Sequence, residues 1–415
     1  MNHIAVIILV AFFFVFFLNL LADILNLSRL SQDLPTALKD IYDPEKYRNA
    51  QSYLKANTRF EWIYAAVQLL ITLCFWFGKG FPLLDTWLQQ LTQHRMIQGL
   101  LFIGLLIFAK GLLDLPFSIY STFVIEEKFG FNQTTLKTFF LDRLKGVFLT
   151  IVLGAPLLAG ILAFFEYAGA NAWLYCWAAV VMFMLVIQFI APAWIMPLFN
   201  QFTPIESGEL KSAILAYAQR IGFALENVFV MDGSKRSSKS NAFFTGFGKH
   251  RRIVLFDTLI RQATTTELVA VLAHEMGHYK KHHIFISLAI GIAHTGLIFL
   301  LLSFFLSYQG LFDAFYMDAP SVHGGLIFFA MLYTPIELVL GILMQMLSRR
   351  NEYAADRFAA ETTNDAEALA SALKKLSALN LSNLTPHPFY VWLHDSHPPL
   401  LERMRALASY RHLPA

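Results

Sequence analysis

Three residues that could do chemistry together, His274, Glu275 and His278, stand within the five-residue sequence His-Glu-Met-Gly-His. Side chains four positions apart lie on the same face of an α-helix, so the two imidazoles can bind one zinc ion. The carboxylate of Glu275 lies beside them and can accept a proton from a zinc-bound water. The pattern therefore predicts peptide hydrolysis with the help of a metal.

The alternative is that both histidines are helix-surface residues that bind nothing. The flanking residues 267–273 are apolar and favour a helix, so helical phase is expected to hold through the motif. Residues Thr264–Thr266 can cap the start of this helix, with Glu267 in its first turn. We therefore expect a helix that carries both imidazoles on one face.

A third metal ligand is needed, because catalytic zinc usually has three protein ligands and one open position. His282 and His283 follow closely, but they stand on another turn or at the membrane edge, and we interpret them as interfacial residues. Glu352 and Asp356 are better placed, since their spacing of four puts both carboxylates on one helix face. Glu352 can bind zinc while Asp356 accepts a hydrogen bond from a ligating imidazole. Three nearby arginines are equally consistent with an ordinary solvated helix, so spacing alone leaves this open.

The elements that must position these residues belong to a membrane protein. The 415 residues are 56% hydrophobic and 15% charged, whereas soluble proteins have about 25% charged residues. The first apolar window lacks a basic region before it and a small-residue cleavage site, so we expect it to be retained. Seven windows are long and apolar enough to span a bilayer: Ile4–Leu25, Phe60–Phe77, Met96–Ile125, Val147–Ala168, Ala172–Phe199, Ile284–Ser307 and Gly325–Leu347.

Basic residues alternate between the loops. Lys and Arg number six in residues 26–59, four in 126–146, eleven in 200–283 and eight after 348, while the intervening loops hold two, none and none. The positive-inside rule then places the N-terminus outside or in the lumen, and the C-terminus and His-Glu-Met-Gly-His in the cytoplasm. The membrane would be the inner membrane of a bacterium or the endoplasmic reticulum of a eukaryote. The net charge of +3, without an aromatic-interleaved basic patch, gives no reason to expect nucleic-acid binding.

Four segments follow from this pattern. Residues 1–199 hold spans one to five and their loops, and 284–348 hold spans six and seven. Residues 200–283 and 349–415 are each too short for a confident independent domain, so we expect them to form one small α/β catalytic unit seated on the helices.

Secondary structure within residues 200–283 is expected to be mixed. An amphipathic helix is predicted over Ser207–Gly222, and strands over Asn227–Asp232, Ser240–Phe247 and Arg252–Asp257, the last two joined at residues 248–251. An edge strand here could pair with an extended substrate backbone. A purely structural hairpin fits each strand residue equally well.

Several motifs together resemble the CAAX prenyl protease 1 family, which comprises integral-membrane zinc metalloendopeptidases of the type that processes the yeast a-factor pheromone and prelamin A. The resemblance covers nearly the whole chain, and its motifs occur in order. They are Glu-Glu-Lys-Phe-Gly-Phe-Asn at 126–132, Pro-Leu-Phe-Asn-Gln-Phe-Thr-Pro at 197–204, His-Glu-Met-Gly-His at 274–278, Asn-Glu-Tyr-Ala-Ala-Asp at 351–356 and Ser-His-Pro-Pro-Leu-Leu-Glu-Arg at 396–403.

The resemblance implies the make-up of the metal centre. His274, His278 and Glu352 would hold one Zn²⁺ per chain, as in a gluzincin. Glu275 would be the general base, and Asp356 would be the hydrogen-bond partner of a ligating histidine.

Further roles come from the same resemblance. His397 would help to hold the substrate carbonyl or the oxyanion, Arg403 would lie near the site, and Asn241 would contact the substrate backbone. The seven spans would enclose a water-filled chamber capped by the zinc site. The substrate would be a peptide, of a kind that is C-terminally prenylated, presented at the lipid bilayer.

Three other readings remain. A quality-control metallopeptidase of the HtpX-like type shares the zinc motifs but is shorter and has fewer spans. A channel or transporter with a non-catalytic metal site would leave the paired carboxylates and histidines unexplained. An intramembrane site-2-type protease would bury His-Glu-Met-Gly-His inside an apolar span, whereas polar residues 279–283 follow it here.

Ionisable residues also occur inside the predicted spans. Lys110 and Asp114 are four apart and could pair, whereas His294 and Glu337 stand isolated in the sequence. Such groups either face a wet interior or hydrogen-bond between helices.

Overall fold

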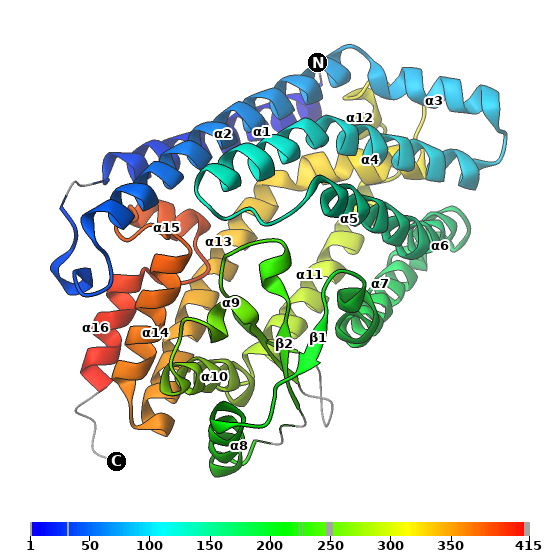
Figure 1. Ribbon diagram of the computed structural model, residues 1–415. Coiled ribbons are helices and arrows are strands. Elements are labelled where there is room, and N and C mark those ends of the chain that lie inside the picture. The colour runs from blue at the N-terminus through cyan, green and yellow to red at the C-terminus, as the bar shows by residue number, and fades with distance from the viewer. Residues whose placement is uncertain (1, 31–32, 224, 226, 246–251, 411–415) are drawn as a thin grey trace.

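Seven long apolar helices make up most of the molecule (Figure 1). The computed structural model describes residues 2–30, 33–223, 225, 227–245 and 252–410. The prediction of a mainly helical seven-span protein is confirmed, because each membrane-capable helix corresponds to one predicted window. These helices are His3–Ser28, Pro44–Phe77, Arg95–Glu126, Leu136–Tyr167, Gly169–Phe199, His283–Phe305 and Val322–Thr363. The water-filled chamber expected between them stays a prediction.

Three of these spans contain a local change of helical pitch, where wider π-helical turns interrupt regular α-helix. The regular membrane helices are therefore α1 (His3–Ser28), α2 (Pro44–Phe77), α4 (Arg95–Tyr120), α5 (Leu136–Leu149), α6 (Ala155–Tyr167), α7 (Ala172–Ile190), α11 (His283–Phe305) and α13 (Val322–Thr363). The remaining helices are α3 (Gly80–Leu91), α8 (Glu209–Arg220), α9 (Asp257–Ile260), α10 (Thr265–Lys280), α12 (Gln309–Asp313), α14 (Ala366–Leu379), α15 (Pro388–His394) and α16 (Leu400–Tyr410).

Three spans extend well beyond their apolar windows. The fourth span begins at Leu136, eleven positions before the predicted window at Val147. Helix α2 begins at Pro44, sixteen positions before the predicted window at Phe60. Helix α13 is one continuous helix of 42 residues, which carries the chain from the last span into the metal-side half of the molecule. Apolar windows do not reveal these extensions, because polar residues lower the hydropathy there while the helical backbone hydrogen bonds continue.

A four-stranded sheet lies next to α10, with β1 (Phe202–Pro204), β2 (Asn227–Met231), β3 (Ala242–Thr245) and β4 (Arg252–Phe256) in the order β1-β2-β4-β3. Strands β2 and β4 are parallel, and the other two pairs are antiparallel. The three predicted strands are present in shorter form, β3 lies at an edge as expected, and the predicted helix over Ser207–Gly222 is α8. Strand β1 was not predicted, and the expected connection at 248–251 lies outside the described residues.

The sheet and six helices share one apolar core. Buried side chains from β4, α8, α10, α13 and α14 meet there, among them Ile253, Leu255, Ile214, Leu272 and Leu369. Burying residues of this size contributes about 1.5–3 kcal/mol each relative to exposure. The two polar segments of the sequence, 200–283 and 349–415, therefore pack against each other, and α10 is fixed between the sheet and α13–α14 (Figure 1).

Ionisable residues within the spans form pairs. Lys110 Nζ lies 2.7 Å from an oxygen of Asp114, as their spacing suggested. The view of His294 and Glu337 as isolated was wrong, because His294 Nε2 lies 3.4 Å from Glu337 Oε2. Those two residues come from neighbouring helices α11 and α13, a contact that sequence separation conceals.

Candidate metal centre

Helix α10 starts where the sequence predicted. Thr264 and Glu267 form a reciprocal capping box, in which the Thr264 side chain accepts from the Glu267 amide and the Glu267 carboxylate accepts from the Thr264 amide. The same carboxylate accepts from Ser371 Oγ at 2.6 Å and Lys375 Nζ at 2.7 Å. These bonds hold the start of α10 against α14, so the helix that carries the two histidines is fixed at its first turn.

The glycine of His-Glu-Met-Gly-His lets α10 approach α13 closely. A Cβ built on Gly277 would lie 3.1 Å from Phe358 Cδ1 and 3.3 Å from the Ala355 Cα and carbonyl oxygen. Such contacts are too tight for a side chain to be accommodated without a shift. Because Ala355 stands next to Asp356, this close crossing brings the carboxylates of α13 to the imidazoles of α10.

Three potential ligand atoms converge at this crossing. His274 Nε2 lies 3.2 Å from His278 Nε2 and 3.4 Å from Glu352 Oε2, and His278 Nε2 lies 3.2 Å from Glu352 Oε1. Among the described residues, this is the set of His, Cys, Asp and Glu side chains whose ligand atoms come close enough to hold one ion.

The donor set fits zinc. A tetrahedral ion with bonds of about 2.0–2.1 Å has ligand atoms roughly 3.3–3.4 Å apart, which is close to the separations observed. Glu352 Oε2 is buried and makes no hydrogen bond. Arg403 Nη1 lies 3.4 Å from this oxygen, beyond ordinary hydrogen-bond distance. A buried carboxylate oxygen without a hydrogen bond is costly, so this atom favours a further cation between Glu352 and the two imidazoles.

Asp356 and Arg403 support the first imidazole from behind. Asp356 Oδ1 lies 2.9 Å from His274 Nδ1, which leaves His274 Nε2 free to face the ligand cluster. Arg403 donates two hydrogen bonds to Asp356, with Nη2 2.6 Å from Oδ1 and Nε 2.8 Å from Oδ2. All three side chains are buried, so Arg403 compensates the charge of Asp356 and fixes the carboxylate plane.

His283 supports the second imidazole, a contact that the sequence analysis did not find. It is buried, and its Nδ1 lies 3.1 Å from His278 Nδ1. His283 is also the first residue of the candidate span His283–Phe305, so its interfacial position stays a prediction. His282 is exposed and adopts a left-handed backbone at the break between α10 and α11. This break turns the chain so that the residue five positions after His278 comes back to it, which simple helical spacing would not allow.

Two side chains next to the ligand cluster, Glu275 and His397, have polar atoms that could contact a substrate. The carboxylate of Glu275 makes no hydrogen bond to any described residue, and burial raises its pKa above the ordinary value for glutamate. His397 Nε2 lies 3.4 Å from Glu352 Oε1, and its side chain is 64% exposed, so it can reach an incoming molecule. The Nδ1 of His397 lies 2.9 Å from Ser396 Oγ.

Asn241 stands immediately before edge strand β3, and its side chain is exposed. Its carbonyl oxygen accepts from the Phe256 amide, and its side-chain oxygen accepts from the Ala242 amide. Among the described residues, no hydrogen bond or ion pair joins Asn241 to the ligand cluster. The structure thus brings seven of the eight expected site residues together and places Asn241 at the end of the neighbouring strand.

Comparison with known proteins agrees with this geometry. Residues 23–201 match the family model for the CAAX prenyl protease N-terminal region with five membrane helices, and residues 204–411 match peptidase family M48. CAAX prenyl protease 1 of Saccharomyces cerevisiae is 37% identical over 90% of this chain and 88% of its own length. The Homo sapiens CAAX prenyl protease 1 homolog is 34% identical over 91% of this chain and 89% of its own length.

A solved structure is also similar. The crystal structure of S. mikatae Ste24p superposes with a TM-score of 0.92 at 35% identity, and the match covers 98% of this chain and 99% of that one. The resemblance expected from the motifs is therefore confirmed in sequence and in fold. The chain belongs to the CAAX prenyl protease 1 family, within peptidase family M48, and is a multi-pass membrane zinc metalloprotease.

Proposed function

We propose that His274, His278 and Glu352 hold the zinc ion and that Glu275 is the general base for peptide-bond hydrolysis. The observation that carries this assignment is the convergence of the ligand atoms of these three residues, with nearest distances of 3.2–3.4 Å, beside the Glu275 carboxylate. Zinc in such a site supplies polarisation of the scissile carbonyl and of the attacking water.

The chain's own residues then move the protons. Glu275 accepts a proton from the attacking water and delivers it to the leaving amine. His397 donates from Nε2 to the developing oxyanion, while Ser396 Oγ donates to its Nδ1 and fixes that tautomer. Asp356, oriented by Arg403, keeps His274 in the tautomer that presents Nε2 to the ion.

The proposed substrates are peptides with a prenylated C-terminal CAAX sequence, from which the enzyme removes the last three residues. Support comes from the names of the relatives, which match nearly the whole length of the chain. Strand β3 offers an unpaired edge next to α10, so an extended substrate could add to the sheet there and contact Asn241.

The proposed orientation places the metal centre on the cytoplasmic side. The distribution of basic residues supports this orientation. Most Lys and Arg residues lie in segments 26–59, 126–146, 200–283 and 349–415, which would all be on the cytoplasmic side. The test uses a variant in which Cys74 and Cys176 are replaced and a single cysteine is introduced at Ser207. This cysteine should react with a membrane-impermeant maleimide only when the reagent can reach the cytoplasmic side of the membrane. Labelling from the opposite side would reverse this orientation.

The test of the activity uses purified protein with a farnesylated CAAX peptide and its unlipidated twin. We expect faster release of the C-terminal tripeptide from the farnesylated peptide, loss of cleavage with a zinc chelator, and recovery when zinc is added back. Equal cleavage of the two peptides would reject prenyl specificity. Cleavage that persists after complete removal of zinc would reject the metal mechanism.

A further inference from the structure

A cavity of about 330 Å³ lies where the end of α1 meets the C-terminal segment. Its walls come from Arg29, which directly follows α1, from α13, from the loop before α15, and from α15 and α16. Three arginines from separate elements line it: Arg29, Arg349 of α13 and Arg405 of α16. The side chains of the metal centre are not among its lining residues.

Two of these guanidinium groups have no partner. Among the described residues, neither Arg29 nor Arg405 makes a side-chain hydrogen bond or ion pair, and both are exposed. Arg349 donates to the carbonyl oxygens of Val391 and Asp395 and so fastens the end of α15. The one carboxylate in the lining, Glu402, accepts from Tyr353 Oη at 3.2 Å. With three arginines and one glutamate in its lining, the cavity therefore carries a net positive charge.

A buried polar atom lies in the same wall. Thr385 belongs to the cavity lining, and its Oγ1 is buried with no hydrogen-bond partner. The loop that carries it is held to α1 by Asn26, whose Oδ1 accepts from Asn383 Nδ2 at 3.0 Å and the His387 amide at 3.1 Å. The relative positions of Arg29 and Thr385 are thus fixed by hydrogen bonds between their own elements.

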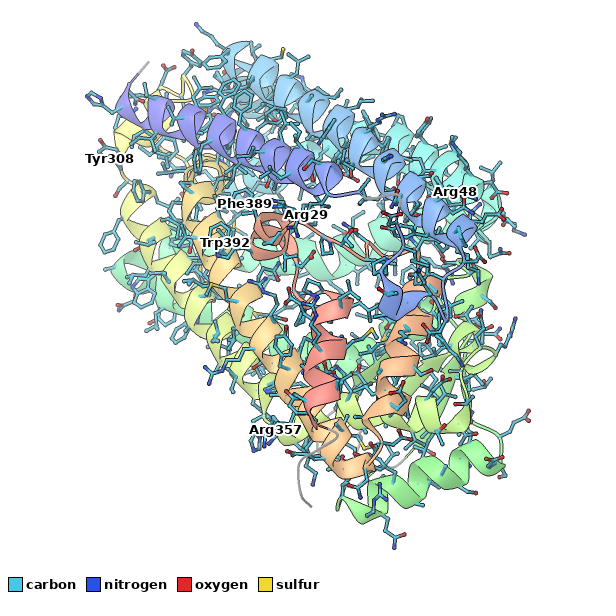
Figure 2. The ribbon with its side chains drawn as sticks, turned by 90° about the vertical axis from the view of Figure 1, so that its left-hand side faces the viewer. Arg29, Arg48, Tyr308, Arg357, Phe389 and Trp392 are labelled. Carbon is cyan, nitrogen blue, oxygen red and sulfur yellow. The ribbon has the colours of Figure 1, made fainter. Side chains whose placement is uncertain are left out.

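The location is a membrane boundary. Arg29 directly follows the apolar span His3–Ser28. Trp392 lines the cavity, is 41% exposed, and stacks on Phe389 at a ring-centroid distance of 5.8 Å. Figure 2 shows Arg29, Phe389 and Trp392 together around α15 at the end of α1. Tryptophan beside arginine at the end of a span is typical of the headgroup region of a bilayer.

We propose that this cavity binds the phosphate-bearing headgroup of an anionic phospholipid. Arg29 and Arg405 would pair with the phosphate or the acidic headgroup, which supplies the missing charge. Trp392 would lie at the level of the glycerol backbone. A lipid is favoured over a soluble anion because the cavity opens at the end of a span, where the acyl chains can continue along the exposed apolar face of α1 that includes Phe17, Leu21 and Ile24.

The test is a binding titration on delipidated, zinc-loaded full-length protein in detergent. Phosphatidylserine or phosphatidylcholine is added, and bound lipids are counted by native mass spectrometry. We expect the first phosphatidylserine to bind at least about fivefold more tightly than the first phosphatidylcholine, the factor that corresponds to about 1 kcal/mol for a basic side chain near an anionic lipid. The double variant Arg29→Gln, Arg405→Gln should lose this preference.

A matched control removes the same charge elsewhere. Arg48 and Arg357 are exposed arginines that lie away from the cavity in Figure 2. The variant Arg48→Gln, Arg357→Gln should keep the preference for phosphatidylserine. As a second measurement, phosphatidylserine should raise the melting temperature of the wild type and of this control more than that of the Arg29, Arg405 variant.

Three results would overturn the proposal. The first is an unchanged phosphatidylserine preference in the Arg29, Arg405 variant, and the second is an equal loss in the control variant. The third is displacement of the lipid by inorganic phosphate alone, which would show that the cavity takes a soluble anion. Each result is independent of the peptidase assay, so failure here leaves the proposed function untouched.

Discussion

Two buried clusters of histidine and carboxylate lie near opposite ends of the molecule, and α13 contributes to both. At one end His323, in the first turn of α13, lies 2.7 Å from Asp85 Oδ1, and Asp85 also accepts from Gln98 at 2.8 Å and Gln89 at 2.9 Å. At the other end α13 presents Glu352 and Asp356 to the imidazoles of α10. Both clusters are buried, and both join elements far apart in sequence.

The difference between them lies in what is left unpaired. Every carboxylate oxygen of Asp85 has a hydrogen-bond donor, so this cluster is complete and fastens α3 and α4 to α13. At the metal centre Glu352 Oε2 makes no hydrogen bond, although Arg403 Nη1 lies 3.4 Å away, and the Glu275 carboxylate makes none to the described residues. A buried histidine beside a carboxylate is therefore no sign of catalysis by itself. The sign is a set of acceptor atoms that converge and that the protein does not satisfy.

The largest expected effect is that of Glu352→Ala. It removes one of three ligands, so we expect zinc content to fall from one ion per chain to nearly none, and cleavage to be lost with it. The loss of affinity should exceed the roughly 10–100-fold that follows removal of a group that only orients a ligand. Elemental analysis of the purified variant measures it, and full zinc occupancy would contradict the distinction between the two clusters.

Glu275→Gln separates chemistry from metal binding. The amide cannot accept the proton, so we expect a fall in kcat of about 10²–10⁴-fold with zinc content unchanged. Turnover of the farnesylated peptide and metal analysis are measured on the same sample. Normal turnover would remove Glu275 from the role of general base.

His283→Phe probes the support of the second imidazole. An aromatic ring is kept while the Nδ1 acceptor for His278 is lost, so zinc affinity should fall by roughly 10–100-fold. Competition with a chelator of known affinity measures it, and kcat at saturating zinc should change far less. The exposed neighbour His282 supplies the control, since His282→Phe should leave zinc affinity unchanged.

Asp85→Asn tests the complete cluster. One carboxylate oxygen becomes an NH₂ donor that faces the donor of either Gln89 or Gln98, so the free energy of unfolding should fall by about 1–3 kcal/mol. Zinc content and turnover per folded molecule should stay at wild-type values. A variant that folds normally but loses zinc would show that the two ends of α13 are not separate in function.

The smallest expected effect concerns pH. Burial by itself raises the pKa of Glu267, but the hydrogen bonds from Lys375, Ser371 and the Thr264 amide outweigh it and lower the pKa below 4.5. The stability from this group is therefore present above the unfolded pKa and is lost as pH falls through the folded value. Glu267→Gln should flatten this acid dependence of the melting temperature while leaving the neutral plateau only slightly lower. An unchanged acid dependence would show that other carboxylates dominate it.

Much of this molecule is predictable from sequence because local rules determine it. The seven apolar windows, the capping box of Thr264 and Glu267, and the shared face of His274 and His278 each depend on residues close together in the chain. The role of Glu352 could not be decided by spacing, since a solvated helix has the same pattern. It required the family motifs, or the crossing of α10 and α13 at Gly277.

The contacts that sequence reasoning could not supply depend on tertiary geometry. His283 reaches His278 only because the backbone turns at His282, and His294 faces Glu337 across two helices. Strand β1 has three residues, too few to show a period of two. None of these features produces a helical or strand periodicity in the sequence, so sequence patterns could not predict them.

The two helices that supply the ligands are attached to the bilayer in different ways. Helix α10 is separated from its span by the left-handed residue His282, which acts as a joint. Helix α13 continues through 42 residues, about 60 Å, with Pro335 in its interior, and carries Glu352 on the same helix that crosses the bilayer. The ligand from α13 is thus joined to its span by continuous helical hydrogen bonds, whereas the two ligands of α10 are joined to theirs only through the turn at His282.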